Sequence, residues 1–392
     1  PSGNPATGLI VNATLKPIST VPEKDIAVSI LLPSLRGGGA ERVMLNIGKG
    51  LSEDSCKIEY VLVKATGSFL KQVPTECRVI DLGARKALTA LPSLIRYLKS
   101  QKPTVVLSSL PHINLTAIFA VLIARTNTKV VLIEHNTLSQ SMAHSSRKVD
   151  RLLPYLMRIF YRFSDHIVAV SNGVAVDLEQ MLRLPKGRLS VIYNPVITPD
   201  LLEKANRPIA HPWYQQRRTP VILAIGRLTQ AKCFDLLLRS FQKARLQEDA
   251  NLIILGEGPD RKALEALTNK LNLRDHVQLP GFVDNPYQYI KNSNLFVLSS
   301  LWEGLPTVLI EALYLGVPII STDCPSGPKE ILKNGRWGTL IPMKDADALT
   351  TAIVFALRNR HDTPPKDSWA PFTQAYAISC YQKLLRQVTE PK

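Results

Sequence analysis

Short apolar runs alternate with helix-like amphipathic segments along the first half of the chain. The apolar runs that predict strands cover residues 26–32, 58–63, 105–108, 130–134 and 166–171. A Gly-rich turn and the helical segment 40–47 follow the first run, and an apolar stretch from Leu189 closes this half. Apolar strands that are separated by helices are typical of a parallel sheet covered on both faces.

The same alternation restarts at Val221, after the polar, Pro-containing stretch 198–220, and further apolar runs begin at Asn251 and Leu295. A chain of 392 residues is too long for one typical core and suits two domains. The sequence therefore predicts an α/β protein with two doubly wound, Rossmann-like domains that face each other across a cleft. Ligands of such domains bind at the carboxyl ends of the strands.

Two carboxylates, Glu303 and Glu311, follow the apolar run at Leu295 and are separated by seven residues. The first is predicted in a loop and the second in a helix. At a rise of about 1.5 Å per helical residue, they would lie at different depths of one site and grip a long ligand at two points. The predicted helix N-terminus at 304–307 offers free N–H groups to a phosphate. A nucleotide-sugar has all the groups that such a site would bind.

Other motifs occur in a fixed order before this pair. They are Gly226-Arg227 with Lys232, Gly256-Glu-Gly-Pro, Gly281-Phe-Val-Asp-Asn and finally Glu303-x7-Glu311. Together they resemble the motifs of retaining glycosyltransferases of family 4 (glycosyltransferase group 1), which have the GT-B fold. The resemblance extends from about residue 26 to 385. Each motif alone is weak, and their common order makes the resemblance specific.

The resemblance implies which domain binds the acceptor and which binds the donor. Residues 1–24 are expected to form a flexible leader, and residues 25–197 an acceptor-side Rossmann-like domain. Residues 198–367 are expected to form the nucleotide-sugar donor domain. By resemblance, residues 368–392 form a terminal helix that crosses back onto the N-terminal domain.

The resemblance also assigns roles to single residues. Arg227 and Lys232 would clamp the diphosphate and neutralise charge on the leaving group. Glu311 would accept hydrogen bonds from the ribose, whereas Glu303 and His135 would be the catalytic residues beside the transferred sugar. The remaining donor-binding residues would be Gly281, Val283, Gly304, Leu305, Pro306 and Thr307.

Three alternatives to these roles stay open on the residues alone. Arg227 and Lys232 would otherwise be solvated surface cations, Glu311 a surface helix acid and Glu303 an acid near a helix N-cap, and His135 a structural histidine. Many relatives have Gly-Phe-Gly where this chain has Gly-Leu-Pro, and Pro306 removes one N–H from the phosphate-binding turn.

The triplet 37–39 permits a ligand to approach the backbone closely. The resemblance places Gly38 and Gly39 against the donor phosphates and the acceptor. A dinucleotide-binding fingerprint would need a glycine where the chain has Arg42, which argues against a dehydrogenase. His112 follows the strand at 105–108 and could line the acceptor site or be structural.

The chain is strongly basic, with a net charge of +16 and a pI near 9.7. Residues 1–200 hold 24 Lys and Arg against 14 Asp and Glu, a balance of +10. Such charge indicates nucleic acid, an anionic membrane face or phosphate-bearing substrates. No zinc-finger spacing or aromatic RNA-binding run occurs, so we expect no nucleic-acid partner.

The segment 147–163 interleaves basic and apolar residues at helical spacing. It predicts either an amphipathic helix on an anionic membrane surface or a core-packing helix with a solvated basic face. For the first alternative we expect Leu153, Met157 and Phe160 to enter the bilayer. Pro154 is expected to perturb the helix midway.

We expect no metal and no cofactor, because neither His112 nor His135 has metal-ligand partners at usable spacing. The five cysteines are scattered, as in a chain with reduced thiols, and no apolar run approaches the ~20 residues that span a bilayer. The predicted location is the cytoplasm, peripheral on the inner face of the membrane.

The predicted function is transfer of a sugar from a nucleotide-diphosphate sugar to a hydroxyl of a glycan acceptor, with a polyprenyl-linked acceptor favoured. The segment Cys324-Pro-Ser-Gly-Pro-Lys-Glu-Ile resembles enzymes that build polyprenyl-linked or surface glycans, which favours a UDP-sugar such as an N-acetylhexosamine. Two alternatives are a GT-B-like epimerase or phosphorylase and a catalytically idle nucleotide-sugar-binding protein. No motif for a phosphorylase cofactor lysine is present.

Overall fold

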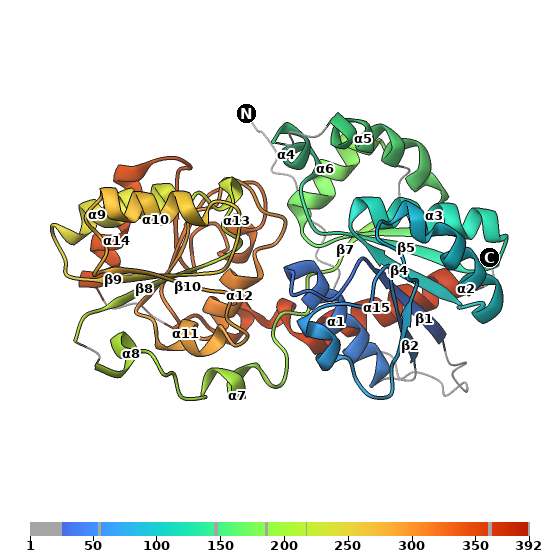
Figure 1. The fold of residues 1–392 in the computed structure, drawn as a ribbon, viewed down its shortest axis with the longest axis horizontal. Coiled ribbons are helices and arrows are strands. Elements are labelled where there is room, and N and C mark those ends of the chain that lie inside the picture. Colours follow the sequence, from blue (N-terminus) through green and yellow to red (C-terminus); the bar gives the residue numbers. More distant parts are fainter. Residues whose placement is uncertain are drawn as a thin grey trace, which may run out of the picture.

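A computed structural model describes residues 26–53, 56–144, 148–184, 187–216, 218–359 and 363–390. The predicted leader at 1–24 lies outside the described residues. Figure 1 shows two α/β domains side by side, the N-terminal one in blue to green and the C-terminal one in yellow to orange. Each domain has one parallel sheet with helices on both faces, so the predicted fold class is confirmed.

The N-terminal sheet has seven parallel strands in the order β3-β2-β1-β4-β5-β6-β7. Their bounds are β1 (Ile26–Leu32), β2 (Cys56–Leu62), β3 (Arg78–Asp81), β4 (Val105–Ser109), β5 (Lys129–Glu134), β6 (His166–Ala169) and β7 (Leu189–Val191). The strand β3 was not predicted from the sequence. It lies at the sheet edge and is mostly exposed, so it lacks the apolar run that marks its neighbours.

The C-terminal sheet has six parallel strands in the order β10-β9-β8-β11-β12-β13. Their bounds are β8 (Val221–Ile225), β9 (Asn251–Leu255), β10 (Val277–Gly281), β11 (Leu295–Leu298), β12 (Ile319–Thr322) and β13 (Thr339–Ile341). In both sheets the strand order reverses beside the first strand, next to β1 and next to β8. Loops at such a reversal leave a crevice at the carboxyl ends of the strands, where ligands bind.

Helices cover both faces of the two sheets. In the N-terminal domain they are α1 (Gly39–Ser52), α2 (Leu91–Gln101), α3 (Pro111–Ala124), α4 (Leu138–Ala143), α5 (Lys148–Phe160) and α6 (Asn172–Leu182). Between and within the C-terminal domain they are α7 (Leu201–Ala205), α8 (Pro212–Gln216), α9 (Phe234–Arg245), α10 (Arg261–Lys270), α11 (Tyr287–Asn292), α12 (Thr307–Tyr314), α13 (Pro328–Ile331) and α14 (Ala346–Arg358). Single 3-10 turns are η1 (Ser68–Gln72), η2 (Leu88–Ala90), η3 (Tyr161–Phe163), η4 (Gln230–Lys232), η5 (Lys366–Ser368) and η6 (Ala370–Phe372).

The last helix, α15 (Gln374–Thr389), leaves the C-terminal domain and packs on α1 of the N-terminal domain (Figure 1). Gln374 donates a hydrogen bond to the carbonyl of Asn46 at 2.8 Å. Gly50 permits the close contact, because a Cβ there would lie 2.4 Å from Ile378. The C-terminal end of the chain is therefore part of the N-terminal domain's packing.

The helix α5 combines features of both alternatives that the sequence left open. Its side chains Leu153, Met157 and Phe160 pack on the core, so the expectation that they enter a bilayer is wrong. They lie on the inner face of the helix, spaced three or four residues apart. The exposed apolar side chains are instead Leu152, Tyr155, Leu156 and Ile159, followed by Phe163. Pro154 lies inside the helix without ending it.

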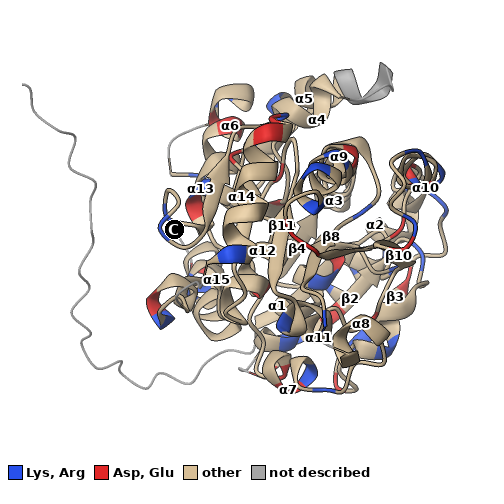
Figure 2. Cartoon of the chain, turned by 90° about the vertical axis from the view of Figure 1, so that its left-hand side faces the viewer, with Lys and Arg blue, Asp and Glu red and all other residues tan. Residues whose placement is uncertain are grey.

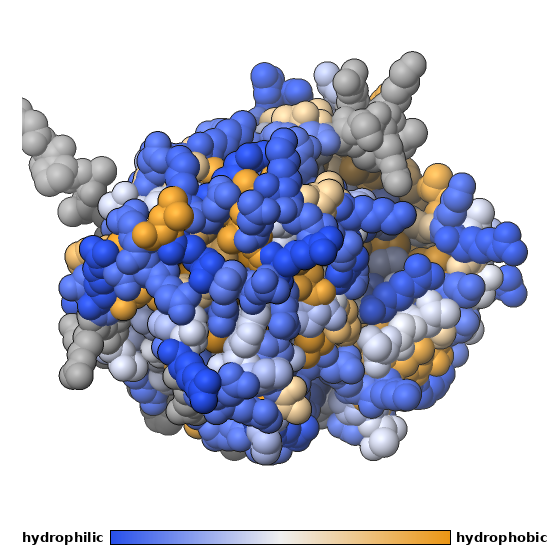
Figure 3. All heavy atoms as spheres, turned by 60° about the vertical axis from the view of Figure 1, so that its left-hand side comes forward, coloured by the Kyte–Doolittle hydropathy of each residue, from blue (hydrophilic) through white to orange (hydrophobic). Residues whose placement is uncertain are grey.

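Most other surfaces are polar. Figure 2 shows Lys and Arg interspersed with Asp and Glu along helices such as α9 and α10. Figure 3 shows a mainly hydrophilic face with apolar side chains in separate groups. Within the described ranges, no helix is both long enough and apolar enough to cross a membrane.

Candidate active site between the domains

The loop between β11 and α12 lies against the loop that follows β5 in the other domain. A Cβ at Gly304 would lie 1.7 Å from the carbonyl oxygen of His135, so only glycine permits this approach. The carbonyl of Gly304 accepts hydrogen bonds from Ser171 and Ser326, each at 2.9 Å. The structure thus brings the predicted residues Gly304 and His135 together, although 169 positions separate them.

Glu303 is bound by a lysine and a serine. The ammonium of Lys232 lies 2.5 Å from Oε1 of Glu303, and Ser300 donates to the same oxygen at 2.6 Å. The side chains of Lys232 and Glu303 are 19% and 11% exposed. Lys232 reaches this position by crossing Gly226, where a Cβ would lie 3.1 Å from the lysine Cε. A glycine at the end of β8 therefore helps to place the lysine.

Arg227 does not take part in this ion pair. Its side chain is exposed, and no described side chain forms an ion pair or hydrogen bond with its guanidinium. Arg227 and Lys232 thus follow the same strand but differ in surroundings: one cation is already paired, and the other is open to an anionic ligand.

Two buried polar atoms near the β11–α12 loop lack hydrogen-bond partners among the described residues. They are Nε2 of His135 and Oε2 of Glu311. Burial lowers the pKa of His135 to about 4, so its imidazole is neutral at pH 7. Burial raises the pKa of Glu311 to about 7, against the attraction of the Arg42 charge. An unpaired buried polar atom costs free energy that a ligand can recover by pairing with it.

The segment from Gly304 to Pro306 is buried, and α12 begins at Thr307 with Pro306 as its N-cap residue. A Cβ at Gly327 would lie 2.5 Å from Cδ of Pro306, so the proline is held by close packing. Leu305 is 6% exposed. Because proline has no N–H, Pro306 cannot donate to a phosphate, and only the other amides at the start of this helix remain available.

The glycine loop after β1 has its own internal partner. The carboxylate of Glu41 accepts the N–H groups of Gly37 and Gly38 at 2.9 and 3.0 Å. Gly38 is the N-cap residue of α1, and Gly39 is its first residue. Of the two predicted loop glycines, the amide of Gly38 is therefore already engaged.

This glycine loop faces the loop after β10. A Cβ at Gly37 would lie 3.6 Å from the ring of Phe282, between the predicted residues Gly281 and Val283. Gly281 has a φ of 95°, a conformation that favours glycine, whereas Val283 packs on the core. His112 is exposed in the first turn of α3, at the carboxyl end of β4.

Sequence reasoning missed several residues that the fold brings to this region. Trp302 stacks on His144 of the other domain, with ring centroids 3.9 Å apart. Arg42 of α1 donates to the hydroxyl of Tyr287 in α11 at 3.0 Å. The sequence hints at these residues only because they lie close to predicted site motifs: Trp302 precedes Glu303, and Arg42 follows the glycine triplet.

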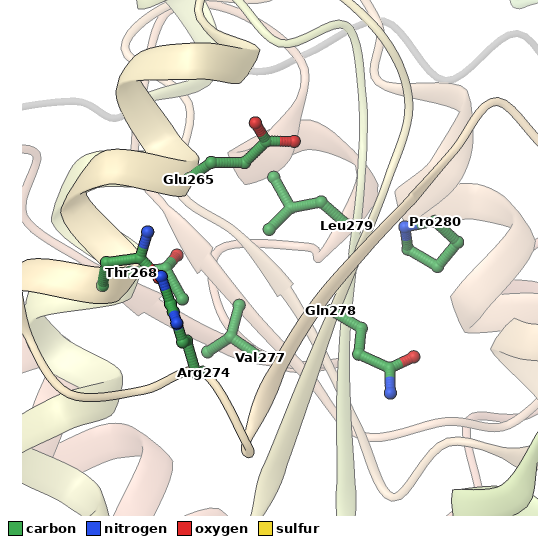
Figure 4. Close-up of a pocket in the computed structure, with 8 residues that line it drawn as sticks. Glu265, Thr268, Arg274, Val277, Gln278, Leu279 and Pro280 are labelled. Atoms are coloured by element: carbon green, nitrogen blue, oxygen red, sulfur yellow. The ribbon is translucent and has the colours of Figure 1, made fainter.

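A hollow of about 370 Å³ lies outside this region, between α10 and β10 (Figure 4). It is lined by Glu265, Thr268, Asn269, Arg274, Val277, Gln278, Leu279 and Pro280. Figure 4 shows these side chains around the outer edge of the C-terminal sheet. None of the predicted site residues lines it.

Both halves of the chain match glycosyltransferase families. Residues 37–198 match the family described as glycosyltransferase family 4, and residues 211–369 match glycosyl transferases group 1. An uncharacterised glycosyltransferase of Methanocaldococcus jannaschii is 34% identical over 254 residues, which are 63% of this chain and 62% of that protein. The chain thus spans less than two thirds of that relative.

A Campylobacter jejuni relative is matched over more of its length. It is named N-acetylgalactosamine-N,N'-diacetylbacillosaminyl-diphospho-undecaprenol 4-alpha-N-acetylgalactosaminyltransferase and is 28% identical over 82% of this chain and 87% of that protein. Among solved structures, Anabaena HepE with UDP and glucose superposes with a TM-score of 0.75 at 19% identity. That superposition covers 92% of this chain and all of the other. The shared fold is GT-B, as the sequence predicted.

Proposed function

Because the chain belongs to the group 1 and family 4 glycosyltransferases, we propose that it transfers a sugar, with retention of configuration, from a UDP-sugar to a hydroxyl of a lipid-linked glycan. An N-acetylhexosamine is the favoured sugar. Two Campylobacter jejuni relatives are named as N-acetylgalactosaminyltransferases that act on undecaprenol-linked glycans, which supports both choices. The HepE structure holds UDP, which supports the nucleotide.

The observation that carries the proposal is the pair of unpartnered buried atoms, Nε2 of His135 and Oε2 of Glu311. They come from different domains and flank the segment that begins at Glu303. A nucleotide-sugar has hydroxyls at both ends, so one ligand could satisfy both atoms. Arg227, exposed and without an ion-pair partner among the described residues, supplies a cation for the diphosphate between these ends.

The proposed reaction breaks the bond between C1 of the sugar and the diphosphate oxygen. The acceptor oxygen forms its bond to C1 on the same face, and its proton passes to the leaving diphosphate, without a protein nucleophile. Lys232, Arg227 and the α12 amides stabilise the charge on that leaving group. His135 acts as a neutral hydrogen-bonding group, since burial holds its pKa at about 4. Glu303 accepts from a sugar hydroxyl while Lys232 holds it in place.

We further propose that the protein works at the inner membrane face, as a peripheral protein of the cytoplasm. The exposed side chains Leu152, Tyr155, Ile159 and Phe163 are 47 to 67% exposed and would enter the interface. Arg158 and Arg162 are exposed on the same segment and would attract anionic lipid, at about 1 kcal/mol per basic residue.

A donor screen tests the proposed function. The purified chain is incubated with UDP- and GDP-sugars and undecaprenyl-diphosphate-linked glycans, while release of nucleoside diphosphate and the anomeric configuration of the product are measured. We expect acceptor-dependent release from a UDP-sugar and a retained configuration. Inversion would refute the retaining mechanism, and conversion of the donor without acceptor would indicate an epimerase.

Binding of a donor without turnover would instead support the alternative of a catalytically idle nucleotide-sugar-binding protein. Glu303→Gln should lose activity, and Glu203→Gln, a change at a site 72% exposed, should keep it. We also propose that no metal is needed, since the lysine and arginine supply the positive charge. Turnover after dialysis against EDTA should then stay within about twofold of the untreated enzyme, because those cations remain.

A further inference from the structure

Arg42 reaches from the N-terminal domain into the region of Glu311. Its guanidinium donates to the hydroxyl of Tyr287 at 3.0 Å and lies 5.9 Å from the centroid of that ring. On its other side it lies 5.0 Å from the ring centroid of Phe69, a residue that is 1% exposed. Two aromatic rings and one hydrogen bond thus hold the charge in place. One ring belongs to each domain.

Glu311 lies within the influence of this charge. It is 4% exposed, and its Oε2 has no hydrogen-bond partner among the described residues. Arg42 is the charged group that acts on its carboxylate, opposing the effect of burial on its pKa. Tyr287, which accepts the hydrogen bond from Arg42, lies in α11, and α11 packs on α12, the helix that contains Glu311. The geometry thus places the three side chains in adjoining elements.

Among the described residues, the other elements packed against α12 supply no further counter-charge to Glu311, and Lys291 of α11 donates to Asn206 instead. The strands β11 and β12 contain no titratable residue, and in α11 the titratable group that responds to Glu311 is the phenol of Tyr287. In α13, Lys329 pairs with Asp323.

The remaining acid of α13, Glu330, is also occupied elsewhere. It accepts hydrogen bonds from Asn172 and Tyr193 of the N-terminal domain. Asp200, on the segment that joins the domains, acts on Tyr287 rather than on Glu311. Within the described part of the chain, the charge opposite Glu311 therefore comes from Arg42.

We propose that Arg42 is a positioning residue for the nucleotide. From the acceptor-side domain, it supplies the positive charge that keeps Glu311 able to accept the hydroxyls of the ribose. The donor site is then complete only while the two domains are together, since separation would withdraw the charge. This inference rests on the proposed function, in which Glu311 binds the nucleotide.

The proposal predicts a specific pH signature. Loss of Arg42 should raise the pKa of Glu311 further, so less of it is ionised at pH 7 and nucleotide binding weakens. Alkaline pH should restore binding, because Glu311 then ionises without help. A merely structural role for Arg42 would weaken binding at every pH.

The test is titration of the full chain with UDP and with GDP by calorimetry between pH 6 and 9. Wild type, Arg42→Gln, Arg42→Lys and Glu311→Gln are compared, with Arg96→Gln as the control that removes an exposed charge from the same domain. If the midpoint moves by about one pH unit, Arg42→Gln binds about fivefold more weakly than wild type at pH 7 and within about twofold at pH 9. Arg42→Lys should rescue most of the loss, and Arg96→Gln should follow wild type.

Each other outcome has one meaning. At each pH, the dissociation constant of a variant is divided by that of wild type, so the effect of the nucleotide's own ionisation, which is common to all variants, cancels. An Arg42→Gln profile that is parallel to wild type, or unchanged from it, would overturn the inference while Glu311→Gln still shows weakened, pH-independent binding. Equal binding by Glu311→Gln and wild type would overturn the donor site of the proposed function. Failure of wild type to bind either nucleotide would overturn both.

Discussion

Replacing Lys232 by alanine is the sharpest test of the site, because it removes one half of a largely buried ion pair. Its ammonium lies 2.5 Å from Oε1 of Glu303. Among the described residues, the variant leaves Glu303, 11% exposed, with the hydroxyl of Ser300 at 2.6 Å as the side-chain partner of its carboxylate. A carboxylate that is held in place by one neutral donor would then face the proposed sugar site.

The expected magnitudes follow from the surroundings of the pair. Breaking a fully buried ion pair costs about 3–5 kcal/mol, whereas an exposed pair contributes about 0–1 kcal/mol. Lys232 keeps 19% of its side chain exposed and the serine bond survives, so we expect the free energy of unfolding to fall by about 1–3 kcal/mol. Turnover should fall on the order of 10²-fold, since the leaving diphosphate loses a cation.

Urea denaturation and steady-state kinetics separate the two effects. Lys243→Ala is the matched control, because its pair with Asp347 has side chains 52% and 86% exposed and should change neither measurement much. The double variant Lys232→Ala with Glu303→Gln should regain part of the lost stability without regaining activity. A folded Lys232→Ala protein with turnover within about twofold of wild type would refute the proposed role at the diphosphate.

Four further predictions concern the remaining groups. Arg227→Ala should lower turnover on the order of 10²-fold without lowering the unfolding free energy, as denaturation and kinetics would show. Glu311→Gln should weaken UDP binding by about 1.5–3 kcal/mol in calorimetry at pH 9, where the wild-type carboxylate is ionised. The pKa of His135 in the folded protein is about 4, below its unfolded value of 6.5, so its contribution to stability is complete above pH 6.5 and is lost towards pH 4. Between pH 6.5 and pH 4, the unfolding free energy of wild type should therefore fall by up to about 3 kcal/mol more than that of His135→Asn, as urea denaturation would show. Wild type should float with anionic liposomes at low salt, and Leu152→Ser with Tyr155→Ser should float less.

Each of the last two predictions has a control or an outcome that would contradict it. High salt distinguishes the forces at the membrane: attraction by arginines falls within a Debye length of roughly 10 Å at 0.1 M, whereas apolar insertion persists. No flotation with anionic lipid at low salt would count against membrane association. A parallel pH profile for wild type and His135→Asn would contradict the neutral, buried state of that imidazole.

The periodicity of the sequence was sufficient to predict most strands. The runs at 26–32 and 251–255 are apolar apart from Ser29 and Asn251, because both faces of each strand are largely buried, and that property is visible within single segments. The edge strand Arg78–Asp81 was missed because it has no such run. The position of Glu311 in a helix was also predictable, since the helical pattern around it is local.

Which face of an amphipathic helix packs inward was not predictable from the pattern. Both Met157 and Ile159 are apolar and lie on α5, yet the first is fully buried and the second is 47% exposed. The pattern gives the spacing of apolar residues, whereas the neighbouring elements decide which of them find a partner.

The sequence alone determined that there are two parallel α/β domains and that Glu303, Arg227 and Lys232 follow strands, where ligands bind. Only the tertiary structure decided that Lys232 pairs with Glu303 while Arg227 does not. It also decided that Arg42 reaches Tyr287 across 245 positions of sequence. The physical reason is that strand and helix formation depends on neighbours along the chain. The Lys232–Glu303 pair instead depends on how the loops after two adjacent strands, β8 and β11, lie beside each other, and the Arg42–Tyr287 contact depends on how the two domains pack.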